Sequence, residues 1–154
     1  MQVFKFGGAS VKDASGVTNV GEIIEKFGDG PLLIVVSAMG KMTNALESLV
    51  HSYLKKDDKA LEVFREIREF HWKIASDLFE QDHPVFASMN DLFVEIEWVL
   101  DTEPQDGYDY VYDQVVSIGE MLSSTILSSH LNAKGISNVW KDARDFIITD
   151  ESYR

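Results

Sequence analysis

The stretch "QVFKFGGAS" (residues 2–10) decides the fold, because a short run of β-branched and aromatic residues ends in two glycines. Such a run is typical of a strand, and Gly7 and Gly8 indicate a tight turn after it. A turn between a strand and a helix gathers free backbone N–H groups where the helix dipole favours an anion. Lys5 directly precedes this turn and can offer an ammonium group to the same anion. We interpret "KFGG" as a phosphate-binding loop, with an ordinary strand-to-helix turn as the alternative.

The same design occurs a second time along the chain. Apolar residues at helical spacing predict a helix over residues 12–27, and a glycine- and proline-containing turn ends it. The run "LLIVVSA" (residues 32–38) predicts a strand buried on both faces of a parallel sheet. A second glycine loop follows at residues 39–44, with a helix capped near Thr43. This order predicts a right-handed βαβ crossover with two adjacent parallel strands.

The middle of the chain predicts a helical block. Amphipathic patterns indicate helices over residues 57–80, over a segment ending near Leu100, and over residues 109–132. Short strands are expected at residues 137–143 and 146–149. Because this last strand pattern would leave the sheet with an apolar edge, we expect the sequence to be part of a longer protein.

Composition narrows the classes of partner and site. The 154 residues suit one domain, and 26 acidic against 14 basic residues give a formal charge of −12. Such a charge disfavours nucleic acid and anionic membranes as partners. The absence of cysteine excludes disulfides and thiol chemistry, and the histidines lack metal-ligand spacing, so we expect no metal site made by the protein. With no signal-peptide pattern or bilayer-length apolar run, we expect a cytoplasmic protein.

Polar groups in two further motifs are candidate ligand contacts. Ser37 and Thr43 flank the second glycine loop and place hydroxyl groups near a helix N-terminus. Glu120 stands among apolar residues in "VVSIGEMLSSTIL" (residues 115–127). A carboxylate in such surroundings either faces solvent or is paired, and a cationic ligand group such as an α-ammonium is one possible counter-ion.

Taken together in this order, the motifs resemble those of aspartate kinases, which belong to the amino-acid kinase fold family. The matching segments are "KFGGASV" (5–11), "VVSAMGKMTNAL" (35–46), "VSIGEMLSSTIL" (116–127), "AKGI" (133–136) and "KDARDFIITD" (141–150). The resemblance implies an α/β, three-layer αβα fold, here a portion with a mainly parallel sheet and a helical block. It also implies that residues 1–154 are the N-terminal part of one catalytic domain, without the ATP-binding second half and the ACT regulatory domains.

The resemblance assigns roles residue by residue. Lys5 resembles the catalytic lysine that neutralises the transferring phosphoryl group. The residues implied for ATP and phosphate binding are Lys5, Gly7, Gly8, Ser10 and Ser37, and those implied for substrate binding are Thr43 and Glu120. Asp142 and Arg144 match a "DxR"-like segment, to which we give a structural role.

The implied reaction is transfer of the γ-phosphoryl group of ATP to the β-carboxylate of L-aspartate. It makes 4-phospho-L-aspartate, at the start of lysine, methionine and threonine biosynthesis, with Mg²⁺ held mainly by ATP. We expect a homo-oligomeric full-length enzyme and no activity from these 154 residues alone. The alternatives are another amino-acid or carbamate kinase of this fold, or a non-catalytic phosphate-binding module.

Overall fold

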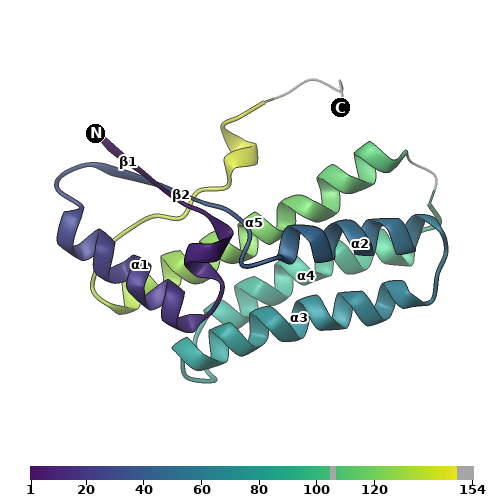
Figure 1. The fold of residues 1–154 in the computed structure, drawn as a ribbon, viewed down its shortest axis with the longest axis horizontal. Helices are drawn as coiled ribbons and strands as arrows, with labels where there is room; N and C mark the ends of the chain where they lie inside the picture. Colours follow the sequence, from purple (N-terminus) through teal and green to yellow (C-terminus); the bar gives the residue numbers. More distant parts are fainter. Residues whose placement is uncertain (105–106, 149–154) are drawn as a thin grey trace.

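The computed structural model describes residues 1–104 and 107–148, and it begins with a parallel strand pair (Figure 1). Strand β1 (Gln2–Phe6) pairs with strand β2 (Leu32–Val36), with Gln2 opposite Leu32 and Phe6 opposite Val36. Helix α1 (Ala14–Phe27) connects them. The prediction of two parallel neighbouring strands joined by a helical crossover is confirmed.

The two faces of this small sheet differ. Phe4, Phe6 and Ile34 are half-buried and pack against the hydrophobic core. Leu33 and Val35 on the opposite face are 49% and 45% exposed. The expectation that the second strand is buried on both faces is therefore wrong for the part of the chain that the structure describes. Side chains alternate between the faces of a strand, and here the helices cover only one of them.

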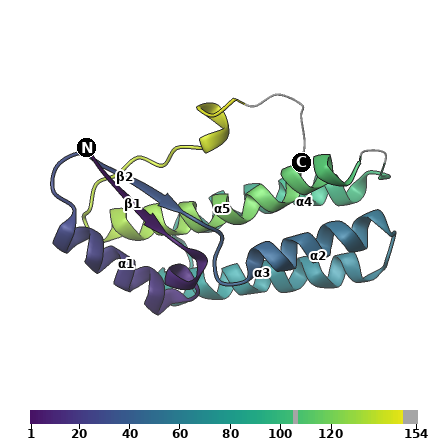
Figure 2. The same ribbon diagram turned by 45° about the horizontal axis from the view of Figure 1, so that its top comes forward.

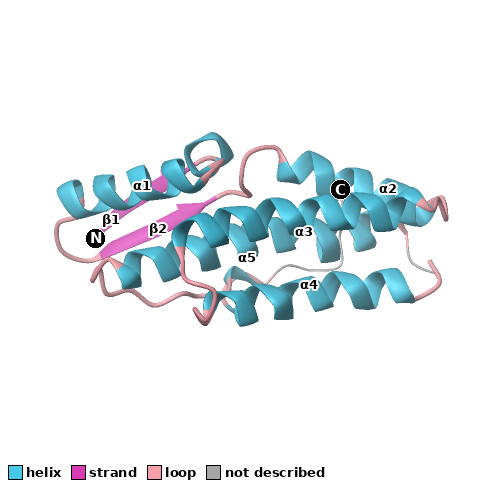
Figure 3. Ribbon diagram, turned by 90° about the horizontal axis from the view of Figure 1, so that it is seen from below, coloured by secondary structure: helices cyan, strands magenta, loops and turns pink. Residues whose placement is uncertain are grey.

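The remaining long helices form a block beside the sheet (Figures 2 and 3). They are α2 (Met42–Leu54), α3 (Lys59–Leu78), α4 (Val85–Asp101) and α5 (Tyr108–Ala133). Helix α5 is the longest at 26 residues and runs from beside the strands to the far end of the block. Side chains with almost no exposure fill the interior, among them Leu46, Ile67, Phe93 and Leu122. The amphipathic patterns thus predicted the helical block and its buried side.

The beginnings of the first two helices differ from the sequence prediction. A short 3₁₀ helix, η1 (Gly8–Val11), precedes α1, whose N-cap is Asp13 with its Oδ1 2.7 Å from the N–H of Gly16. Helix α2 begins at Met42 after Lys41, so Thr43 lies inside its first turn and is not its cap. The reason is Gly40, whose φ of +55° turns the chain so that helical geometry starts before the threonine.

The described segment after α5 contains no strand. The expectation of strands at residues 137–143 and 146–149 is therefore wrong for residues 137–148, and Thr149 lies outside the described residues. Instead, Asn138 binds Ser128 and residues 143–145 form a short 3₁₀ helix, η2 (Ala143–Asp145). A strand requires a neighbouring backbone, and among the described residues β1 and β2 pair only with each other. Among these residues, no helix combines the length and apolarity needed to cross a membrane.

Candidate active site

The first glycine loop lies at the carboxyl end of β1, next to the side chain of Lys5. Lys5 is exposed, and its Nζ lies 3.6 Å from the position that a Cβ on Gly7 would take. Gly7 is the N-cap of η1, and its carbonyl oxygen accepts a 2.9 Å hydrogen bond from the N–H of Ser10. The ammonium group therefore stands beside backbone that has no side chain to block a ligand.

The second glycine loop lies directly against the first. The N–H of Ser37 donates to the carbonyl oxygen of Phe6 over 3.0 Å, and the N–H of Gly40 donates to that of Gly8 over 2.9 Å. A Cβ on Gly8 would lie 2.5 Å from the carbonyl oxygen of Ala38, so only glycine fits this contact. The carboxyl ends of β1 and β2 thus form one hydrogen-bonded surface, which is where open α/β sheets bind their ligands.

Helix α5 contributes Glu120 to the same place. Glu120 is half-buried, and its Oε1 accepts a hydrogen bond from the N–H of Ala38 over 3.4 Å. Its Oε2 makes no hydrogen bond with any residue that the structure describes. A carboxylate so placed beside the second loop has one oxygen free for the cationic group of a ligand.

Three hydroxyl groups predicted for the site surround these loops. Ser10 is exposed in η1, Ser37 is half-buried after β2, and Thr43 is half-buried in the first turn of α2. None of the three side chains hydrogen-bonds to another residue within the described ranges. Their hydroxyl groups are therefore free to bind a ligand, and Thr43 offers its hydroxyl at the N-terminus of α2, whose dipole favours an anion.

Some residues of this surface were missed by the sequence prediction. Lys12 lies against the second loop, with its Cβ 3.7 Å from the Cβ position of Gly40, and Lys41 is exposed at the N-cap of α2. Together with Lys5 they place positive charge around the loops of a chain whose formal charge is −12. A local cationic patch can attract an anion despite an acidic surface elsewhere. Lys12 belongs to the site because the first loop contacts the second one, and spacing along the sequence gives no sign of that contact.

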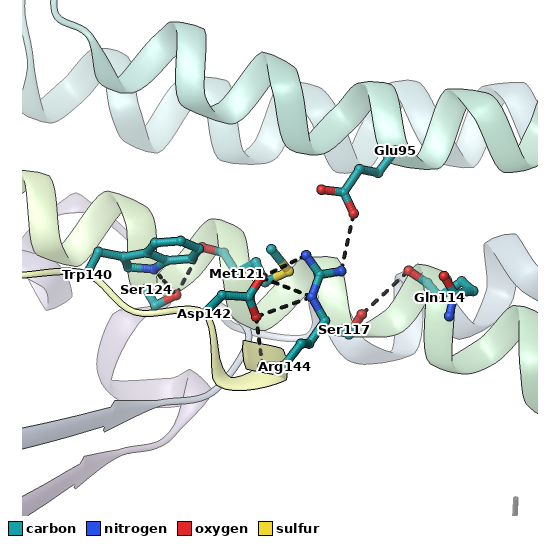
Figure 4. Close-up of polar contacts among 8 residues, drawn as sticks. All are labelled: Glu95, Gln114, Ser117, Met121, Ser124, Trp140, Asp142 and Arg144. Atoms are coloured by element: carbon teal, nitrogen blue, oxygen red, sulfur yellow. Dashed lines mark hydrogen bonds and ion pairs between the residues drawn. The ribbon is translucent and has the colours of Figure 1, made fainter. Parts of the chain in front are cut away.

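Asp142 and Arg144 form a separate cluster that fastens the segment after α5 to the helical block (Figure 4). The Nη2 of Arg144 lies 2.8 Å from Oδ2 of Asp142, and its Nη1 lies 3.2 Å from Oε2 of Glu95 on α4. Burial raises the pKa of Asp142, but hydrogen bonds from Arg144 outweigh this and lower it; the same pairing raises the pKa of Arg144. Nearby, the indole N–H of Trp140 donates to Ser124 Oγ over 2.9 Å. These contacts fit a structural tether.

A comparison with family models identifies the family of this chain. The model of the amino acid kinase family matches residues 1–153, so the chain belongs to that family. Within it, an aspartokinase from Chlamydia trachomatis is 31% identical over 152 residues, covering 98% of this chain and 32% of that protein.

Solved structures show the same fold. E. coli aspartokinase III in complex with lysine and aspartate superposes with a TM-score of 0.85 at 24% identity, covering 99% of this chain and 34% of that chain. The same enzyme in complex with aspartate and ADP gives a TM-score of 0.80 at 24% identity, covering 94% and 31%. The likeness confirms the predicted amino-acid kinase fold. The 154 residues span about a third of the length of these proteins.

Proposed function

We propose that this chain is the N-terminal part of the catalytic domain of an aspartate kinase, which phosphorylates the β-carboxylate of L-aspartate with ATP. The observation that carries the proposal is the continuous contact from Gly8 through the second glycine loop to Glu120. It joins a phosphate-type loop to a carboxylate suited to an α-ammonium. Its relatives support the same substrates, since one of them is an aspartokinase and one solved neighbour is in complex with aspartate and ADP.

Within this proposal the residues divide into two groups. Lys5 balances the charge of the transferring phosphoryl group, and the phosphates lie over backbone N–H groups of the first loop, with Ser10 and Ser37 as hydroxyl donors. Thr43 and Glu120 hold the amino acid, Glu120 through its free Oε2. Phosphoryl transfer needs positioning and charge neutralisation more than covalent chemistry, and this set of residues supplies both.

ATP would carry its Mg²⁺ into this site. Within the described ranges, no group of three or more histidine or carboxylate side chains is placed to hold a metal ion. The hydroxyl groups and lysines around the loops suit phosphate oxygens, so we assign the ion to the phosphates, where it neutralises charge when bound. We further infer that a second half of the domain completes the ATP site, that 154 residues alone are inactive, and that the full-length enzyme is a cytoplasmic homo-oligomer.

An assay of the full-length gene product tests the proposal. ATP-dependent formation of aspartyl phosphate is trapped as the hydroxamate, with L-glutamate and carbamate as competing acceptors and residues 1–154 assayed in parallel. We expect activity with L-aspartate from the full-length protein and none from residues 1–154. Activity with another acceptor would replace aspartate kinase by a different kinase of this fold. Phosphate binding without transfer to any acceptor would support the non-catalytic module.

A further inference from the structure

Helix α5 packs tightly against α2 and the second glycine loop at Gly119, the residue before Glu120. A Cβ on Gly119 would lie 2.7 Å from Cδ1 of Leu46 on α2 and 3.0 Å from Cβ of Ala38 in the loop. Both distances are shorter than carbon atoms accept without movement. Leu46 is 0% exposed and Ala38 is 3% exposed, so neither can swing out into solvent, and making room for a Cβ would require other buried groups to move.

The residue next to this contact is the one that reaches the loop. Glu120 touches the N–H of Ala38 over 3.4 Å, which is already at the long end for a hydrogen bond. Any outward shift of α5 would break this bond and carry the carboxylate away from the loop. Close-packed interiors transmit such a displacement and do not absorb it locally.

We propose that Gly119 is a positioning residue that sets the spacing between α5 and the second glycine loop and thereby places the Glu120 carboxylate for the α-amino group of the substrate. This rests on the substrate role proposed for Glu120. Glycine is disfavoured in a helix interior, and its presence in α5 is accounted for by a contact that admits no Cβ. We expect the effect to fall mainly on the amino-acid side of the site, because Gly119 contacts Ala38, whose amide binds Glu120, and does not itself contact Lys5 or Gly8.

Kinetics of the full-length protein with a compensating pair of substitutions test this role. Gly119→Ala adds one methyl group. Leu46→Val shortens by one carbon the side chain that this methyl group would strike, so the double variant nearly conserves volume. We expect Gly119→Ala to raise the KM for aspartate about 10- to 100-fold, with kcat and the KM for ATP within about threefold of wild type. Leu46→Val/Gly119→Ala should return the KM for aspartate to within about threefold of wild type.

A glycine-to-alanine substitution at the other end of α5 is the control for adding a methyl group where it meets no close contact. Gly107, the N-cap of α5, has no non-neighbouring atom of the described residues within 4 Å of its Cβ position, so Gly107→Ala should leave the KM for aspartate unchanged. The proposal fails if Gly119→Ala leaves that KM unchanged, if it lowers kcat and raises both KM values equally, or if Leu46→Val does not rescue it.

A second readout does not depend on catalysis. Amide hydrogen exchange of Ala38 reports its hydrogen bond to Glu120, and we expect faster exchange in Gly119→Ala and unchanged exchange in Gly107→Ala. If the wild-type protein does not phosphorylate aspartate but Ala38 responds in this way, the proposed function is wrong and the spacing role of Gly119 stands. If aspartate is phosphorylated and neither exchange nor the KM responds, the inference about Gly119 is wrong.

Discussion

The N–H of Gly40 lies 2.9 Å from the carbonyl oxygen of Gly8, and this hydrogen bond joins two loops that are far apart in the sequence. It ties the turn after β1 to the turn after β2, beyond the last residues of the sheet ladder. Gly8 also packs against Ala38, whose amide donates to Glu120. The phosphate side and the amino-acid side of the proposed site are thus parts of one hydrogen-bonded unit.

Gly8→Ala should disrupt this unit. The added Cβ would lie 2.5 Å from the carbonyl oxygen of Ala38 and 2.9 Å from that of Gly40, and neither backbone atom can swing aside as a side-chain end could. We expect a loss of about 1–3 kcal/mol in the free energy of unfolding, as for other overpacked sites. Because the loops would separate, kcat/KM should fall for both substrates. Urea denaturation and steady-state kinetics measure these effects, and unaltered values for both would contradict the proposed contact.

Lys5→Ala should act mainly on the chemical step. Lys5 stands beside the first loop, where charge changes most during transfer, and a group that acts there appears in kcat more than in KM. Loss of one preorganised donor of this kind costs about 10²–10³-fold in kcat. Lys26→Ala on the exposed side of α1 removes the same charge at a distance and is the control. A loss of similar size in both variants would mean that only overall charge matters.

Glu120→Gln should act mainly on aspartate binding. The substitution keeps the shape and an oxygen acceptor for Ala38, but it removes the charge that pairs with the α-ammonium. That ammonium carries the same charge before and during transfer, so the loss should appear in the KM for aspartate, by about 10- to 100-fold, which is the range for a charge-assisted hydrogen bond. Glu22→Gln on exposed α1 is the matched control. A normal KM in Glu120→Gln would reassign the amino-acid contact to another residue.

His71 should make stability depend on pH. It is 0% exposed, its Nδ1 lies 2.7 Å from the carbonyl oxygen of Ile67, and its Nε2 has no hydrogen-bond partner among the described residues. Burial lowers the pKa of His71 to about 4 from 6.5, against a smaller opposing effect of the Ile67 hydrogen bond. Between these two values the unfolded chain binds a proton that the folded chain does not, so stability falls as pH falls.

The size of this effect follows from the shift. At 1.36 kcal/mol per pKa unit, protonation of His71 in the unfolded chain lowers the free energy of unfolding by about 3 kcal/mol as the pH falls from 6.5 to 4. Urea denaturation at pH 7 and at pH 4.5 should show a smaller difference in His71→Leu than in wild type, since carboxylates titrate alike in both. Burial and the charge of Lys134 also lower the pKa of His130. His130 should therefore leave part of the pH dependence of stability in the His71→Leu variant. Equal slopes in the two proteins would show that His71 is not protonated on unfolding.

The sequence by itself determined those features that depend on neighbours along the chain. The strand before Gly7, the crossover helix, the second strand and the existence of the long helices, with their approximate extents, follow from turn residues and from the spacing of apolar side chains. Lys5, the glycine loops and Glu120 were identified as a set because their motifs occur in a recognisable order. Nothing local, however, states how far apart those motifs lie in space.

The tertiary structure alone decided how these pieces touch. The hydrogen bond from Gly40 to Gly8 and the close approach of Gly119 to Leu46 depend on how α5 packs against α2 and on the register of the sheet. The same holds for the segment after α5, whose apolar pattern predicted strands but whose side chains bind α5 and α4. A strand exists only where a second backbone completes its hydrogen bonds, and a site only where packing brings separate segments within contact distance. Both conditions are set by distances between residues remote in sequence, which local pattern does not encode.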